Sequence, residues 1–171
     1  MDVPADNKKG FRIRYVYYGP WYIWDEPESV IRREKAVYTV ACLLEAVCFL
    51  TAATRECALN YHVLVGVFGM LAVAAFVFKA IGVVRFGAAK KRMTRPAYQE
   101  ISGMMKVAGS LEAALLFAAS AAGVVVMLME RLPVSVLPVA AGYLATAFLA
   151  VSVCVRFWKL RCVTETNDVT W

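Results

Sequence analysis

The stretch of sequence that decides the fold is VSVLPVAAGYLATAFLAVSVCV, at residues 134–155, which carries no charged side chain. A helix of a soluble protein has an apolar stripe and a polar face, and this stretch has no such polar face. At a rise of about 1.5 Å per residue, it is long enough to cross about 30 Å of hydrocarbon. It therefore predicts a helix that is surrounded by lipid rather than by water.

Three further segments have the same apolar character and a similar length. The four segments are residues 36–54, 60–84, 107–129 and 132–155, and each ends at a charged or helix-breaking residue. The composition agrees, because 61% of the 171 residues are hydrophobic and 19% are charged, whereas soluble domains are about 45–50% apolar. The sequence predicts an all-α integral membrane protein, with a four-helix bundle over residues 36–157.

Short connections predict how these helices pair. Residues 55–59 and 130–133 are too few to do more than join antiparallel neighbours, so two tight hairpins are expected. The sequences around Glu45 and Glu112 resemble each other, as do those around Arg85 and Arg156. Two hairpins copied from one another would explain this; chance similarity between apolar sequences is the alternative.

The Lys and Arg residues are distributed unequally around the segments. Sixteen lie before the first segment, in the central connection or after the last segment, against Arg55 and Arg131 on the other side. The positive-inside rule therefore predicts a multi-pass protein of the inner or plasma membrane, with both termini and the central loop cytoplasmic. The net charge of +6 is then explained by the orientation of the protein in the membrane and by contacts with lipid headgroups, and no nucleic-acid partner is expected.

Four basic residues of the central connection are candidates for contacts with anionic lipid headgroups. They are Lys90, Lys91, Arg92 and Arg95, and each basic residue close to such a surface contributes about 1 kcal/mol. A basic loop that is simply solvated is the plainer interpretation.

Residues 158–171 are expected to form a cytoplasmic tail.

Residues 1–35 contain a cluster of aromatic side chains. The cluster surrounds a Gly19-Pro20 turn and consists of Tyr17, Tyr18, Trp21, Tyr22 and Trp24. Tyr and Trp prefer the headgroup region of a bilayer, so we expect this segment to lie along the cytoplasmic interface. A docking surface for a partner protein is the alternative.

Three ionisable residues lie at membrane depth, where each costs about 2.5–3.5 kcal/mol on insertion scales. By helical rise, Glu45 lies about 15 Å deep, counted from Lys35. Lys79, counted from Arg85, and Glu112, counted from Lys106, each lie about 9 Å from the cytoplasmic side. Equal depth predicts an ion pair between Lys79 and Glu112 and leaves Glu45 without a basic partner at its own depth; a Lys79 side chain that stretches towards Glu45 is the alternative. A lone carboxyl group in a low dielectric favours its protonated form, so Glu45 is a candidate for proton or cation binding. A hydrogen bond that holds two helices together is the structural alternative.

Motifs for catalysis or metal binding are not found in the sequence. One His and five Cys residues form no ligand cluster and no C-x-x-C pair, and there is no phosphate-binding glycine loop. The sequence therefore predicts no metal and no cofactor, and it does not favour an enzyme.

Two functions remain as hypotheses. The first is a small transporter or channel-like protein in which Glu45, Lys79 and Glu112 line a polar path for proton or cation coupling. The second is a non-catalytic accessory or assembly subunit that binds a larger membrane protein through the aromatic segment and the helix faces rich in small residues. A homo-oligomer is also expected, because four helices enclose little polar space.

Overall fold

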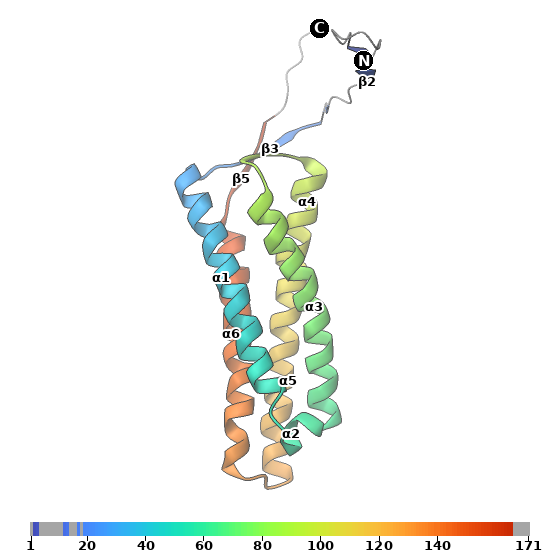
Figure 1. Cartoon of the computed structure of the whole chain (residues 1–171), viewed down its shortest axis with the longest axis vertical. Coiled ribbons are helices and arrows are strands. Elements are labelled where there is room, and N and C mark those ends of the chain that lie inside the picture. The colour runs from blue at the N-terminus through green and yellow to red at the C-terminus, as the bar shows by residue number, and fades with distance from the viewer. Residues whose placement is uncertain (1, 4–11, 14–16, 18, 166–171) are drawn as a thin grey trace.

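The computed structural model describes residues 2–3, 12–13, 17 and 19–165. Four long helices lie side by side (Figure 1). They are α1 (Glu28–Ala53), α3 (Val63–Ala88), α5 (Gly109–Met129) and α6 (Leu137–Lys159). All four belong to helical stretches that are long and apolar enough to cross a membrane. This confirms the predicted bundle of apolar helices and suggests a multi-pass membrane protein.

Shorter helices complete the chain. The helix α4 (Arg95–Gly103) runs into α5 through a π-helical turn, η1 (Met104–Ala108), so that the three form one continuous rod. The helix α2 (Ala58–Tyr61) occupies the connection between α1 and α3, and the 3₁₀ turn η2 (Val134–Val136) precedes α6. Proline lies in the first turn of α4 and of α6, where the backbone N–H groups have no partner within the helix, so the missing N–H of proline costs no helical hydrogen bond.

The four long helices form a ring. The helix α1 packs against α3 and α6, and α5 packs against the same two helices. The carboxylate-bearing helices α1 and α5 therefore lie at opposite corners of the bundle. Side chains that point inward from these two corners meet at its centre.

A small antiparallel sheet closes one end of the bundle. Its central strand is β3 (Trp21–Trp24), flanked by β4 (Arg92–Thr94) and β5 (Cys162–Glu165). In the register, Tyr22 lies opposite both Met93 and Thr164. A separate two-stranded pairing joins β1 (Asp2–Val3) to β2 (Arg12–Ile13). We call the end that carries β3, β4 and β5 the sheet end, and the opposite end, with α2, the far end.

The sheet corrects the all-α expectation. Residues Trp21–Trp24 of the aromatic segment form its central strand, which packs on the bundle. Trp24 is 1% exposed, and its ring packs edge-on against the rings of Phe86, Tyr98 and Phe157. Such aromatic contacts bury a large apolar area in fixed geometry. They anchor β3 to α3, α4 and α6.

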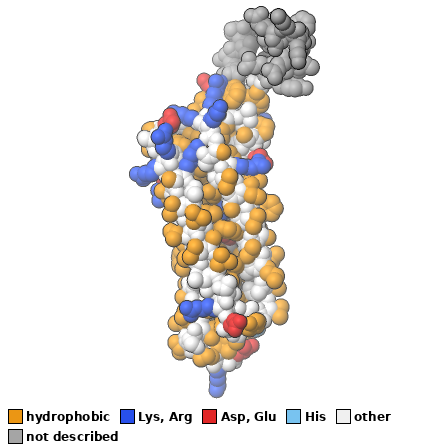
Figure 2. Space-filling view, viewed as in Figure 1, with side chains coloured by type: hydrophobic (Ala, Val, Ile, Leu, Met, Phe, Trp, Pro, Cys, Tyr) orange, Lys and Arg blue, Asp and Glu red, His pale blue; other side chains and the backbone are white. Residues whose placement is uncertain are grey.

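The surface between the two ends is apolar. Figure 2 shows hydrophobic side chains over the length of the helices, with charged side chains mainly towards the ends. Large hydrophobic residues such as Leu43, Met70 and Phe148 are more than half exposed. Soluble monomers rarely expose apolar patches of this extent, which agrees with the apolar character of the four helices.

Candidate functional site

An ionic triad lies at the centre of the bundle. Lys79 of α3 places its Nζ 2.5 Å from Oε2 of Glu45 on α1 and 2.6 Å from Oε2 of Glu112 on α5. The three side chains are between 0 and 2% exposed. All three ionisable residues singled out in the sequence are therefore brought together. The predicted pair of Lys79 with Glu112 is present, and Lys79 also reaches Glu45, for which no basic partner at its own depth was expected.

The error in depth has a simple cause. The side chain of Lys35 on α1 donates a hydrogen bond to the carbonyl oxygen of Ala89 over 2.5 Å, so these two residues lie within one side-chain length of each other. Glu45 lies ten residues from Lys35, and Lys79 lies ten residues from Ala89, so each lies about 15 Å further along its helix towards the far end. The earlier depth for Lys79 was counted from Arg85, but α3 continues beyond Arg85 to Ala88.

Side-chain direction also favours the contact. In a helix, the Cα–Cβ bond tilts towards the N-terminus. The N-terminus of α3 is at the far end, so Lys79 points from its helix towards the middle of the bundle. The helices α1 and α5 run in the opposite direction, so Glu45 and Glu112 point back to meet it.

The triad carries a net charge of −1 when all three groups are ionised, since two carboxylates share one ammonium group. Oε1 of Glu45 is buried and has no hydrogen-bond partner among the described residues. A buried uncompensated charge costs several kcal/mol, on the order of the desolvation penalty of one ion. A proton or another cation bound at the carboxylates would remove that cost.

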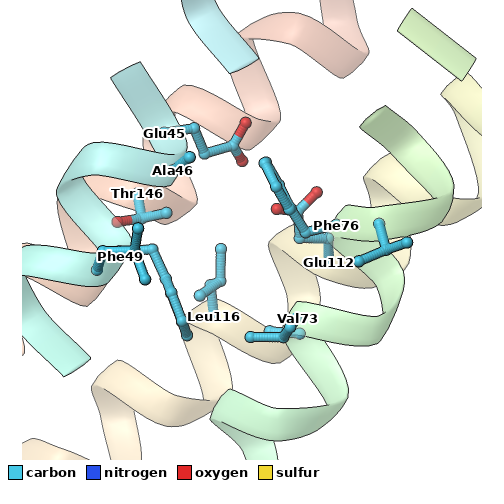
Figure 3. Close-up of a pocket in the computed structure, with 11 residues that line it drawn as sticks. Glu45, Ala46, Phe49, Val73, Phe76, Glu112, Leu116 and Thr146 are labelled. Atoms are coloured by element: carbon cyan, nitrogen blue, oxygen red, sulfur yellow. The ribbon is translucent and has the colours of Figure 1, made fainter. Parts of the chain in front are cut away.

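A cavity of about 240 Å³ adjoins the two carboxylates. Figure 3 shows Glu45 and Glu112 near one end of it, with Leu116 and Val73 near the other. Among the described residues, the one other lining residue with a polar side chain is Thr146, whose hydroxyl group donates to the carbonyl oxygen of Gly142 over 2.8 Å. The remaining lining residues are apolar: Ala46, Phe49, Leu50, Ala72, Val73, Phe76, Val77 and Leu116. The cavity is therefore apolar except at its carboxylate end.

The cavity opens on the side of the bundle. Leu50 of α1 and Val73 and Val77 of α3 line it, and these three residues are between 41 and 57% exposed. Its mouth therefore lies between α1 and α3, on the apolar surface of the helices. A molecule at this apolar surface would meet the mouth directly.

Both ends of the bundle are closed to this cavity. Towards the sheet end, Tyr38, Phe86 and Met105 are at most 1% exposed and belong to one packed cluster. Towards the far end, the hydroxyl group of Tyr143 donates to Oδ1 of Asn60 over 2.9 Å, and the ring of Tyr143 packs against a neighbouring aromatic ring. Asn60 in turn donates to backbone oxygens at the end of α1. The lateral mouth is thus the shorter route to the carboxylates.

Two residues next to the triad, Phe76 and Gly109, were not predicted from the sequence as parts of the site, because neither has an ionisable side chain. The Lys79 ammonium group lies 5.2 Å from the centre of the Phe76 ring, a cation–π contact. Gly109 lies against the Lys79 side chain, since a Cβ atom at Gly109 would be 3.5 Å from Cδ of Lys79. The spacing of Phe76 and Lys79 along one helix is the signal that could have indicated the first contact.

The aromatic candidates lie at the sheet end, away from the triad. Tyr22 stacks on Tyr98 with ring centres 4.6 Å apart, and Tyr17 packs edge-on against Trp21 at 5.2 Å. Tyr18 lies outside the described residues. These side chains contact the chain's own helices and strands.

The basic candidates also lie at the sheet end. Arg92 is ion-paired with Glu165 over 3.0 Å, and its guanidinium group lies 4.5 Å from the centre of the Trp21 ring. Lys91 accepts a backbone hydrogen bond from β3, and the Arg95 N–H donates to a tyrosine oxygen of the aromatic segment. Nearby, burial raises the pKa of the Cys162 thiol to about 11, so this thiol stays protonated at neutral pH.

In the part of the chain that the structure describes, no group of three or more His, Cys, Asp or Glu residues could hold a metal ion. Fold alone does not determine function, so the triad and its cavity carry the functional argument. Comparison of the chain with protein-family models, with curated proteins and with solved structures gives no match.

Proposed function

We propose that this chain is a small multi-pass membrane protein that moves a proton or another cation by binding it at Glu45 and Glu112. The single observation that carries the proposal is the sharing of one ammonium group, that of Lys79, by two fully buried carboxylates. Intramembrane ionisable groups are costly and commonly mark ion pathways. A site with one carboxylate in excess is neutralised when it binds one proton or one monovalent cation.

The ion pairs suggest how the site would work. With both carboxylates ionised, Lys79 is held between them. When one carboxylate takes a proton or a cation, Lys79 is left in a one-to-one pair with the other carboxylate. The triad therefore has two charge states, net −1 and neutral, and the neutral state is favoured in a low dielectric.

The proposed orientation follows from the positions of the basic residues. The sheet end gathers Arg85, Lys90, Lys91, Arg92 and Arg95, whereas Arg55 and Arg131 lie in the far-end connections. By the positive-inside rule, the sheet end faces the cytoplasm of a cell with an inner or plasma membrane. The carboxylates are then reached from the lipid side, through the mouth between α1 and α3.

Proton flux in proteoliposomes tests the proposal. Purified protein would be reconstituted with an internal pH-sensitive dye, and an imposed proton gradient would be followed in the wild type and in Glu45→Gln and Glu112→Gln variants. Each substitution removes the excess negative charge and keeps a one-to-one pair with Lys79. We expect flux in the wild type, and its loss in both variants.

The matched control is Glu100→Gln. Glu100 is paired with Arg85 and is about half exposed, so the change removes the same charge outside the triad. Its flux should equal that of the wild type. Equal flux in the wild type, Glu45→Gln and Glu112→Gln would refute the proposal.

The second function, an accessory subunit of a larger membrane protein, stays a hypothesis. It is based on the aromatic residues of the N-terminal segment and on the helix faces rich in small residues. Three of them, Trp21, Tyr22 and Trp24, contact the chain's own sheet and helices. These contacts account for the aromatic residues within the chain itself, so we base the proposal on the triad.

A further inference from the structure

We propose that the cavity between α1 and α3 binds a small lipophilic organic cation that enters from the lipid phase. Such a cation carries one ammonium group on a single aromatic or branched apolar body. This inference rests on the proposed function, because it names the cation class that the triad accepts. It depends on the cavity as well as on the charges, so the two proposals are separable by experiment.

The cavity has polarity at one end only. Glu45 and Glu112 lie at that end, and the hydroxyl group of Thr146 is already used within α6. All other lining side chains are apolar. A ligand that fits this distribution has one positive group and an otherwise apolar body, since any second polar group would be buried without a partner.

Aromatic rings at the cavity suit an organic ammonium group. Phe49 of α1 and Phe76 of α3 both line it (Figure 3). The Phe76 ring already lies 5.2 Å from the Lys79 ammonium group, which shows that its face is placed for a cation. Cation–π attraction is stronger in a site that excludes water. Substituted ammonium groups, which are weakly hydrated, benefit most from such a site.

The volume limits the size of the ligand. At about 240 Å³ the cavity is smaller than the roughly 300–1,000 Å³ of ordinary ligand pockets. It accommodates a single ring or a compact branched group next to the charge. A multi-ring compound or a phospholipid headgroup with its several polar atoms does not fit.

An inorganic ion is disfavoured by the oxygen ligands available. Ca²⁺ takes about six to eight oxygen ligands, and Mg²⁺ binds at proteins with several retained waters. The cavity offers two carboxylates, each of which also contacts Lys79. The half-exposed apolar residues at the mouth, Leu50, Val73 and Val77, would further exclude a hydrated ion.

Binding of benzyltrimethylammonium to the purified protein in detergent, measured by isothermal titration calorimetry, tests this inference. The matched ligand control is neopentylbenzene, which has the same shape without the charge. We expect the cation to bind at least about tenfold more tightly than the neutral compound, because the buried carboxylates attract its positive charge where little water screens it. Glu45→Gln and Glu112→Gln should each weaken cation binding by about tenfold or more, because each removes one of the two negative charges.

A variant that blocks the mouth tests whether the ligand occupies the cavity. Val73→Trp fills the mouth and leaves the triad intact, and Val73 is 41% exposed, so the larger ring has room at the surface. We expect it to lose benzyltrimethylammonium binding. Val67→Trp is the control, because Val67 is 49% exposed on the same helix but does not line the cavity.

Three results would overturn the inference. They are equal affinity for the charged and the neutral compound, unchanged cation affinity in both glutamine variants, and unchanged affinity in Val73→Trp. Proton flux without cation binding in the wild type would also overturn it while leaving the proposed function standing. Cation binding without proton flux would support the cavity as a cation site and count against proton movement.

Discussion

The two hairpins of the bundle, α1 with α3 and α5 with α6, bury corresponding positions, most of them with different residues. The eight buried positions of α3 recur 71 residues later: Val65, Gly69, Ala72, Ala75, Lys79, Gly82, Val83 and Phe86 correspond to Val136, Ala140, Tyr143, Thr146, Ala150, Val153, Cys154 and Phe157. Buried positions of α1 recur 67 residues later in the same way: Glu34, Tyr38, Cys42, Glu45 and Ala52 correspond to Ile101, Met105, Gly109, Glu112 and Ala119. The agreement favours the hairpin-copy interpretation over chance similarity.

One position makes the two hairpins chemically different. Both contribute a carboxylate, Glu45 and Glu112, but the lysine of the first hairpin corresponds to Ala150 in the second. The lateral cavity also belongs to the first hairpin, since its mouth lies between α1 and α3. An approximately repeated frame thus places two acids at the centre, and a single unrepeated lysine turns them into a site with one negative charge in excess.

Removal of that lysine should have the largest effect on stability. In Lys79→Met, two buried carboxylates lose their only described cation, and breaking a buried pair in this way costs about 3–5 kcal/mol. We expect the free energy of unfolding, measured by titration with SDS in mixed micelles and circular dichroism, to fall by this amount at neutral pH. Acid should restore part of it, because bound protons neutralise the two carboxylates.

The control for this variant is Lys106→Met. Lys106 is only partly buried, and its ammonium group lies 4.9 Å from the centre of the Trp158 ring, outside the triad. An exposed cation–π contact contributes about 0.5–1 kcal/mol. A Lys79→Met variant no less stable than Lys106→Met would show that the triad does not hold the helices together.

Transfer of the lysine to the other hairpin should recover part of this loss. In the double variant Lys79→Ala, Ala150→Lys, the ammonium group would approach the same two carboxylates from α6, whose position 150 is fully buried. We expect the double variant to be more stable than Lys79→Ala alone in the same SDS titration. The single variant Ala150→Lys, with two lysines at the centre, is the control. If the loss of unfolding free energy in the double variant equalled the sum of the losses in the two single variants, positions 79 and 150 would not correspond as proposed.

The sequence predicted the apolar framework well and the contacts less well. The four helices follow from long uncharged runs, such as residues 134–155, because apolar length is a local property of the chain. The three residues of the triad were found for the same reason, since each charge stands out in an apolar segment. Their pairing was only half right, because depth depends on where Ala88 ends its helix and on the level of neighbouring helices.

The sheet and the cavity had no comparable local signal. The strand β3 pairs with segments about 70 and 140 residues away; β4 has only three residues, and β5 does not alternate clearly between apolar and polar residues. The cavity depends on the spacing between two helices and on small residues such as Ala46 and Ala72. These features arise only when distant segments pack together.

The two hairpins also differ in how an arginine is paired, and this difference should have a moderate effect. Arg156 of α6 donates two hydrogen bonds to Glu34, whose side chain is 10% exposed, whereas Arg85 of α3 pairs with Glu100 when both are nearly half exposed. Glu34→Gln should cost about 1–3 kcal/mol and Glu100→Gln at most about 1 kcal/mol. Equal losses of unfolding free energy in the two variants would contradict this difference in burial.

The smallest effect is expected at the π-helical turn η1, which has no equivalent in the first hairpin. Ile101 lies before this turn and Gly109 lies directly after it, and both are buried, so they share one face of the rod although they are eight residues apart. A π turn holds one more residue than an α turn. With one residue removed they would be seven residues apart, and seven residues of α-helix rotate by about 700°, close to two full turns. Deletion of Val107, which is 70% exposed, should therefore give a continuous α-helix with both residues still buried. We expect the free energy of unfolding to change by less than about 1 kcal/mol, with proton flux retained. A large loss of stability would show that the π turn itself positions Glu112 against Lys79.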